Sequence, residues 1–254
     1  MLDVDDHASV PHSRGSMDET GGQSTPLIST SGELPFLLKV LAAAEPLSLQ
    51  AHPSLEQAKN GYARENRLGV PVSNSRRIYR DPFAKPELLC ALGPFEAFCG
   101  FSEPITSVEL LHSIGGGASV LARLLTDHDL NHLLHYMFSG TEEIRILLTD
   151  VVEACAQHDS PHAMWATRLN TRYPNDPAVV ASLLLNHVIL SAGEALYLDP
   201  GNLHAYLSGT GVEVMGSSDN VVRCGLTNKH VDINELLATV IACPLPDPVL
   251  RPTP

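Results

Sequence analysis

The strongest constraint on the fold is a change in the sequence pattern near residue 188. From Val188 onward, glycines interrupt short apolar stretches every few residues, as at Gly193, Gly201 and Gly209. Short apolar segments between closely spaced turn residues are typical of a jelly roll or barrel. Residues 103–187 instead repeat apolar side chains at helical spacing. The sequence therefore predicts a mainly β fold, a β-sandwich that carries an all-helical insertion.

Helix-capping signals place several helices. Ser54-Leu-Glu-Gln57 is a capping box, which predicts a helix over about 54–66. Thr106-Ser-Val-Glu109 predicts a second helix that begins there, and Gly115-Gly-Gly117 ends it. A further helix is expected over 141–158, and Asp232 is expected to cap a final helix that reaches about residue 242.

The remaining segments are less regular. The apolar run from Leu34 to Ala44 has no period that separates a helix from a buried strand. Residues 70–82 are basic and contain proline, which indicates a loop, and Glu87–Leu92 is expected to be a strand.

Composition then divides the chain into five segments. Residues 1–32 are rich in Ser, Gly, Thr, Asp and His and are expected to be disordered or irregular. Residues 33–102 and 188–243 are expected to form the two parts of one β domain, on either side of helical residues 103–187. Residues 244–254 are a Pro-rich tail.

Charge and cysteine usage exclude several classes of protein. The formal charge of -13 argues against a nucleic-acid partner, which would require a basic face. No apolar run is long enough to span a membrane and no signal peptide opens the chain, so we expect no membrane partner. Five cysteines without a CxxC pair suggest reduced thiols in the cytoplasm. We expect Cys90, Cys99 and Cys224 to be buried and inert.

Several short motifs resemble one enzyme family in both order and combination. They are PLSLQAHP at 46–53, KPEL at 85–88, GPFEAFCGF at 93–101, GNLHAYLSG at 201–209, and three runs between 212 and 229, namely VEVM, SDNVVR and GLTNK. Over about 34–241 the chain resembles a type I phosphomannose isomerase, a zinc-dependent family of the cupin class. This resemblance implies a cupin-type jelly roll, with the first apolar run forming a strand that continues into residues 47–52.

The resemblance also implies a metal site, with one Zn²⁺ per chain. Its ligands would be Gln50, His52, Glu87 and His204, which are far apart along the chain. A mixed nitrogen and oxygen ligand set suits a borderline divalent ion such as zinc. Gln50 and His52 are two positions apart and would point to the same face of a β-strand.

The implied reaction interconverts D-mannose 6-phosphate and D-fructose 6-phosphate through an enediol, a step in carbohydrate metabolism on the route to GDP-mannose. Such chemistry requires a base near the two reacting carbons and an electrophile on their oxygens. The resemblance implies catalytic roles for one set of residues and substrate contacts for another. The catalytic set is Lys85, Glu213, Asp219 and Arg223, and the substrate-binding set is Ser48, Tyr206 and Lys229. Either Glu213 or Asp219 could transfer the proton.

Three histidines in the helical segment offer a competing metal site. His128, His132 and His135 have the spacing of one helix face. They lie outside every matching motif, so a solvated helix face is the preferred interpretation. Gly115–Gly117 is interpreted as a loop because no Lys-Ser/Thr follows it.

The chain also departs from the family pattern. Residues 82–87 read PFAKPE where the family has an Asn-His-Lys-Pro-Glu-like run, and Asp199 stands where cupins often have proline.

Family members are longer at both ends, so the chain looks like a truncated copy with exposed sheet edges. The alternative function is therefore a non-catalytic zinc or sugar-phosphate-binding cupin. Another cupin chemistry, metal-dependent oxygenation, would require more His ligands. We expect a monomer.

Overall fold

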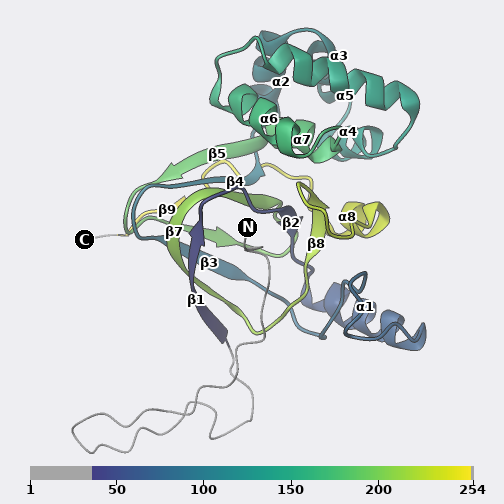
Figure 1. Ribbon diagram of the computed structural model, residues 1–254, viewed down its shortest axis with the longest axis vertical. Helices are drawn as coiled ribbons and strands as arrows, with labels where there is room; N and C mark the ends of the chain where they lie inside the picture. The colour runs from purple at the N-terminus through teal and green to yellow at the C-terminus, as the bar shows by residue number, and fades with distance from the viewer. Residues whose placement is uncertain (1–35, 253–254) are drawn as a thin grey trace, which may run out of the picture.

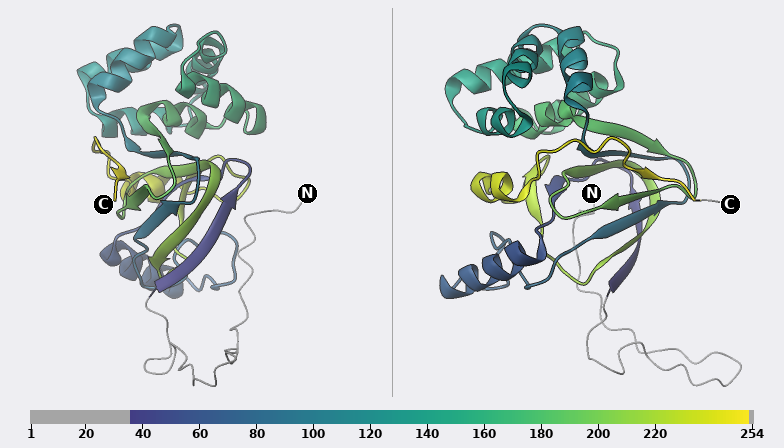
Figure 2. Two further views of the ribbon diagram at one scale, coloured as in Figure 1. Left: turned by 90° about the vertical axis from the view of Figure 1, so that its left-hand side faces the viewer. Right: turned by 180° about the vertical axis from the view of Figure 1, so that it is seen from behind.

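The computed structural model describes residues 36–252, in which nine strands form two antiparallel sheets joined by one long strand, β7. The second half of β7 pairs with β1 and β3, and its first half pairs with β2 and β4. The strands curve into a nearly closed jelly-roll barrel (Figure 2). The strands are β1 (Phe36–Ala43), β2 (Leu49–Ala51), β3 (Glu87–Ala91), β4 (Phe95–Phe101), β5 (Leu185–Leu190), β6 (Ala195–Leu198), β7 (His204–Gly216), β8 (Val222–Gly225) and β9 (Val249–Leu250).

Gly209 allows β7 to pass from one sheet to the other. Its φ is +124°, a value that favours glycine, and a Cβ at this position would come within 2.7 Å of the Pro94 carbonyl oxygen. The β7 backbone therefore approaches the start of β4 more closely than any side chain would permit.

Helices α2 to α7 gather on one side of the barrel, next to β4 and β5, whereas α1 and α8 lie away from them (Figure 1). The helices are α1 (Leu55–Arg67), α2 (Pro104–Ile114), α3 (Gly117–Asp127), α4 (Leu130–Met137), α5 (Glu142–Cys155), α6 (Pro161–Arg172), α7 (Pro177–Ala181) and α8 (Ile233–Thr239), with a 3-10 turn at Ser182–Leu184. No described helix is long and apolar enough to cross a membrane. The predicted mainly β fold with helices inserted between strands is thus confirmed.

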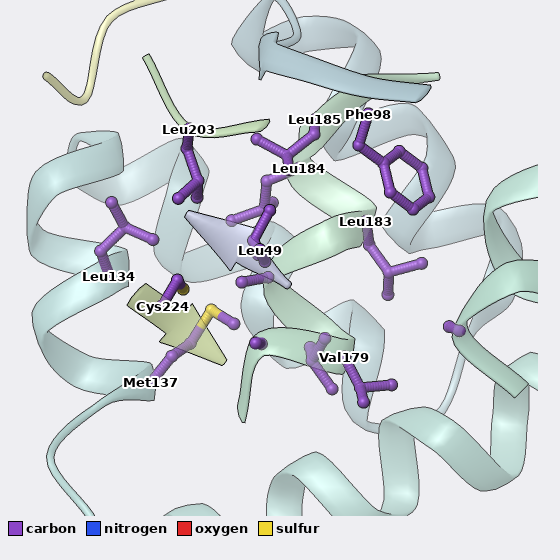
Figure 3. Packing of buried hydrophobic residues seen from close by; sticks show 14 of the residues in the cluster. Leu49, Phe98, Leu134, Met137, Val179, Leu183, Leu184, Leu185, Leu203 and Cys224 are labelled. Atoms are coloured by element: carbon purple, nitrogen blue, oxygen red, sulfur yellow. The ribbon is translucent and has the colours of Figure 1, made fainter. Parts of the chain in front are cut away.

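The helices and the barrel share a hydrophobic core. One cluster combines Leu49 and Phe98 from the strands with Met137 and Val179 from the helices (Figure 3). A second cluster fills the barrel interior around Leu89, Phe95, Leu196 and Tyr206. The first cluster contains residues from both the expected β domain and the expected helical domain. The division of the chain into these two domains stays a prediction.

Local signals predicted some helix ends well. The Ser54 capping box is confirmed, since Ser54 Oγ accepts from the Gln57 backbone and the Gln57 side chain accepts from the Ser54 backbone. The break at Gly115–Gly117 is confirmed, and α5 begins after its cap Thr141. The final helix is capped by Asp232 as expected but ends at Thr239, earlier than predicted.

Two predictions of element bounds were wrong. The second helix begins at Pro104 rather than near Thr106, because proline has the backbone φ of a first helical turn and needs no hydrogen-bond partner there. The first apolar run does not continue as one strand into residues 47–52. Pro46, which has no N–H to donate, lies in the gap between β1 and β2.

The two ends of the chain differ in how much of them the structure describes. The expected disorder of residues 1–32 lies outside the described residues. Within residues 244–252 of the Pro-rich tail, β9 pairs with β6 and the Leu245 N–H donates to the Phe101 carbonyl.

All five cysteines are free thiols. Cys99 and Cys224 are buried as expected, whereas Cys90 is half-buried and Cys243 is exposed. Burial raises the pKa of Cys99 to about 12, which disfavours the reactive thiolate.

Candidate metal centre

Three of the four expected metal ligands meet inside the barrel. His52 follows β2 directly, Glu87 is the first residue of β3, and His204 is the first residue of β7. The pairing of β2 with β7 at Gln50 and His204 brings His52 close to His204. Glu87 pairs with Met215 at the other end of β7, so it reaches the two histidines across the curved barrel rather than along one strand pair. The Gly201 N–H donates to the His52 carbonyl at 2.8 Å and joins the loop before His204 to the end of β2.

The ligand atoms of this trio lie within 4.8 Å of one another. His52 Nε2 is 3.2 Å from Glu87 Oε1, and His204 Nε2 is 3.6 Å from Glu87 Oε2. All three side chains are buried, with exposures of 2% or less. Among residues 36–252 this is the one His, Cys, Asp or Glu group of three with metal-binding geometry.

The hydrogen bonds of the trio fit a bound cation. His52 Nε2, Glu87 Oε2 and His204 Nε2 are buried in this structure and have no hydrogen-bond partner. Leaving three converging polar atoms unsatisfied is costly, and a divalent ion that accepts nitrogen and oxygen ligands would satisfy all of them. The donor set therefore fits zinc.

Backbone carbonyls fix which ring nitrogen of each histidine faces the centre. His52 Nδ1 lies 2.8 Å from the Asn220 carbonyl oxygen, and His204 Nδ1 lies 3.0 Å from that of Asn202. A carbonyl can only accept, so each Nδ1 must carry a proton, and in the neutral ring each Nε2 presents a lone pair.

Electrostatics favour the protonation states that a metal requires. Burial alone would raise the pKa of Glu87, but the positive charges of His52 in its protonated form and of Lys85 outweigh it and hold this pKa well below its usual value. Lys85 Nζ lies 2.9 Å from Glu87 Oε1. Burial lowers the pKa of His204 to about 4. At neutral pH the carboxylate is thus ionised and His204 is neutral.

The fourth expected ligand, Gln50, borders the trio. It pairs with His204 across β2 and β7 and with Arg223 across β2 and β8. Its Oε1 accepts a hydrogen bond from Ser48 Oγ at 3.1 Å. Coordination by Gln50 stays a prediction.

A carboxyl and a phenol lie next to the trio. Tyr206 is two residues beyond His204 on β7, and its hydroxyl donates to Glu213 Oε1 at 2.9 Å. Burial and the nearby charge of Glu87 raise the pKa of Glu213. Burial also raises the pKa of the Tyr206 hydroxyl well above its usual value.

Lys39 also belongs to this surrounding, although no sequence motif marked it. It lies opposite Glu213 in the pairing of β1 with β7, and its charge helps to lower the pKa of that carboxyl. The period-two pattern of β1, in which Phe36, Leu38 and Val40 are exposed, indicates that Lys39 faces the other way. That alternation could have identified Lys39 once the run was known to be a strand.

The other expected site residues are not all brought into this group. Ser48 is buried next to Gln50, and Arg223 is half-buried on β8. Asp219 and Lys229 are exposed, and the Asp219 backbone N–H donates to Asp81. Their catalytic and substrate-binding roles stay predictions.

The competing histidines do not form a metal site. His128 caps the end of α3, whereas His132 and His135 lie on α4, so the three do not share a helix. All three are exposed, and the rings of His128 and His132 stack with centroids 4.1 Å apart. The solvated interpretation agrees with this arrangement.

A cupin-type jelly roll therefore encloses a buried His-Glu-His group that could hold a metal ion. Residues 16–104 match the family model for the catalytic domain of type I phosphomannose isomerase. Over these residues the chain is similar to the catalytic domain of the type I phosphomannose isomerases. The match extends the family resemblance to residue 16, further toward the N-terminus than the sequence motifs indicated.

Known proteins agree with this assignment. The chain is 42% identical to mannose-6-phosphate isomerase of Salmonella typhimurium over 222 residues, which are 85% of this chain and 56% of that protein. It is 42% identical to the Escherichia coli enzyme over 216 residues, covering 82% and 54%. A crystal structure of the Salmonella typhimurium enzyme bound to fructose 6-phosphate and zinc superposes with a TM-score of 0.81 at 36% identity, covering 90% of this chain and 60% of that one. The chain thus spans about half the length of these curated relatives.

Proposed function

We propose that this chain is a zinc-dependent aldose-ketose isomerase that interconverts D-mannose 6-phosphate and D-fructose 6-phosphate. The observation that carries the proposal is the buried His52, Glu87 and His204 trio, with its three unsatisfied ligand atoms next to the Glu213 carboxyl. The relatives are named mannose-6-phosphate isomerases, and one of their structures holds fructose 6-phosphate and zinc.

In the proposed mechanism a carboxylate moves a proton between the two reacting carbons. Glu213 is preferred over Asp219, because it is buried near the trio and its pKa is raised, whereas Asp219 is exposed. A carboxyl with a raised pKa is better matched to proton transfer near neutral pH. The hydrogen bond from Tyr206 fixes the orientation of Glu213.

Zinc, when bound by His52, Glu87, His204 and Gln50, would polarise the substrate oxygens. The cationic side chains of Lys85 and Arg223 would stabilise negative charge that develops on the enediol. In the same scheme Ser48, Tyr206 and Lys229 contact the hydroxyls and the phosphate of the sugar. The negative net charge of the chain makes such local positive charge necessary for an anionic substrate.

The test is an isomerase assay on the purified chain with added zinc and then with a chelator. Turnover that requires zinc and is lost with the chelator is the expected result. One bound zinc without turnover would support the alternative, a non-catalytic zinc or sugar-phosphate-binding cupin. If the chain neither bound zinc nor turned over the substrate, both functions would be rejected.

A further inference from the structure

Asn220 joins the two chain segments that carry His52 and Glu87. Its side chain is completely buried, with an exposure of 0%. Its backbone carbonyl holds His52 Nδ1 at 2.8 Å, while its side-chain amide faces residues 80–83, which lie just before Lys85 and Glu87. One residue therefore contacts both sides of the metal centre.

The amide of Asn220 uses both its donor and its acceptor atoms. Its Oδ1 accepts from the backbone N–H groups of Arg80 at 2.7 Å and Asp81 at 3.3 Å. Its Nδ2 donates to the backbone oxygens of Asp81 at 2.8 Å and Phe83 at 3.0 Å, and to Asp81 Oδ1 at 3.1 Å. Because the backbone partners fix which end donates, no other side chain of this size could replace the amide.

Ser218 completes the network from the same turn. Its hydroxyl accepts from the Asn220 backbone N–H at 3.2 Å and lies 3.2 Å from the Phe83 carbonyl, to which it donates. The carbonyl that orients His52 is thus held from both sides of its own residue, by Ser218 and by the Asn220 amide.

We propose that Asn220 is a positioning residue that sets the distance and ring orientation of His52 relative to Glu87, and so determines the affinity for zinc. This inference rests on the proposed zinc site and extends it to a residue that contacts no ligand atom of the metal. Groups that orient metal-bound histidines from outside typically change metal affinity about 10- to 100-fold when they are removed.

The test compares Asn220→Ala with Asn202→Ala. The Asn202 carbonyl accepts from His204 Nδ1 in the same way, but among the hydrogen bonds of the described residues none comes from the Asn202 side chain. Zinc affinity is measured by competition with a chromophoric chelator. We expect Asn220→Ala to bind zinc about 10- to 100-fold more weakly and Asn202→Ala to stay within about twofold of the unmodified chain.

Ser218→Ala serves as a milder second variant that keeps the buried amide. It is expected to weaken zinc binding in the same direction by a smaller factor, and it decides the question if Asn220→Ala does not fold. The visible spectrum of the cobalt-substituted protein supplies a readout of ligand geometry, which a general loss of stability would leave unchanged in the folded fraction.

Unchanged zinc affinity in Asn220→Ala and Ser218→Ala would overturn the inference, as would an equal loss in Asn220→Ala and Asn202→Ala. These outcomes are distinct from failure of the proposed function itself, because in that case the unmodified chain would not bind zinc.

Discussion

At the scale of single residues, Glu213 is where burial most directly changes the chemistry of a proposed catalytic group. Its pKa is raised by desolvation and by Glu87, while Lys85 and Lys39 lower it. A base must be ionised to accept a proton, so activity should fall as the pH drops through this raised pKa. The acid limb of the kcat profile is therefore expected above the usual carboxyl pKa of about 4.3.

Glu213→Gln keeps the size of the side chain but removes its ability to accept a proton. We expect kcat to fall about 10²- to 10⁴-fold, while zinc stoichiometry stays at one per chain. Asp219→Asn is the matched control and should stay near the unmodified rate, because Asp219 is exposed. The reverse pattern, with Asp219→Asn inactive and Glu213→Gln active, would assign the proton transfer to Asp219.

At the scale of secondary structure, the crossing of β7 between the sheets depends on Gly209. Gly209→Ala adds the cost of an unfavourable φ, about 1–3 kcal/mol, to a steric overlap with Pro94 and Phe95. Gly193→Ala shares a positive φ of 88° but meets no atom within 4 Å, so it isolates the backbone cost. Denaturant unfolding should show a clearly larger loss for Gly209→Ala. Equal losses would mean that β7 moves to accommodate the methyl group.

A second element-scale prediction concerns the junction between α6 and β5. His162 Nε2 lies 2.9 Å from the Leu185 carbonyl oxygen, and burial lowers the pKa of His162 below its usual 6.5. The unfolded chain therefore takes up a proton near pH 6.5 that the folded chain resists. It follows that His162 reduces stability as the pH falls below this value.

Urea unfolding of the metal-free protein at pH 7 and pH 5 measures this effect. The loss of unfolding free energy on acidification should be smaller in His162→Gln than in the unmodified chain. His128→Gln, which alters an exposed histidine, should show the unmodified pH dependence. An equal response in all three proteins would exclude His162 as a source of acid sensitivity.

These elements show why the sequence predicted some features and not others. The Ser54 capping box was predictable because its partner Gln57 is three residues away. Asn220 was not singled out, because its carbonyl meets His52, 168 residues away, and its amide meets Phe83, 137 residues away. The trio itself came from family motifs rather than from spacing. Its geometry depends on the closure of the barrel, because Glu87 pairs with Met215 at the opposite end of β7 from His204.

At the scale of the whole molecule, the shared hydrophobic core decides whether the helices and the barrel are stable separately. Leu49 and Phe98 belong to strands, whereas Met137 and Val179 belong to helices, and all four are buried in one cluster (Figure 3). Separating α2–α7 from the barrel would expose these side chains, at about 1.5–3 kcal/mol for each large one. We therefore expect the described chain to unfold as a single cooperative unit.

Two probes, one on a helix and one in the barrel, test the expectation. Trp165, the only tryptophan of the sequence, lies on α6 and donates to Glu96 of β4 at 2.6 Å. Its fluorescence reports the helical side, while the visible absorption of cobalt bound at His52, Glu87 and His204 reports the barrel. Unfolding in urea should give the same midpoint and slope with both probes. If fluorescence changed at lower urea than cobalt absorption, the helices would be a separate folding unit, as the sequence pattern alone suggested.

Because cobalt stabilises only the state that binds it, the fluorescence transition should also move to lower urea when a chelator removes the metal. That shift would couple the metal centre to α6 through the common core.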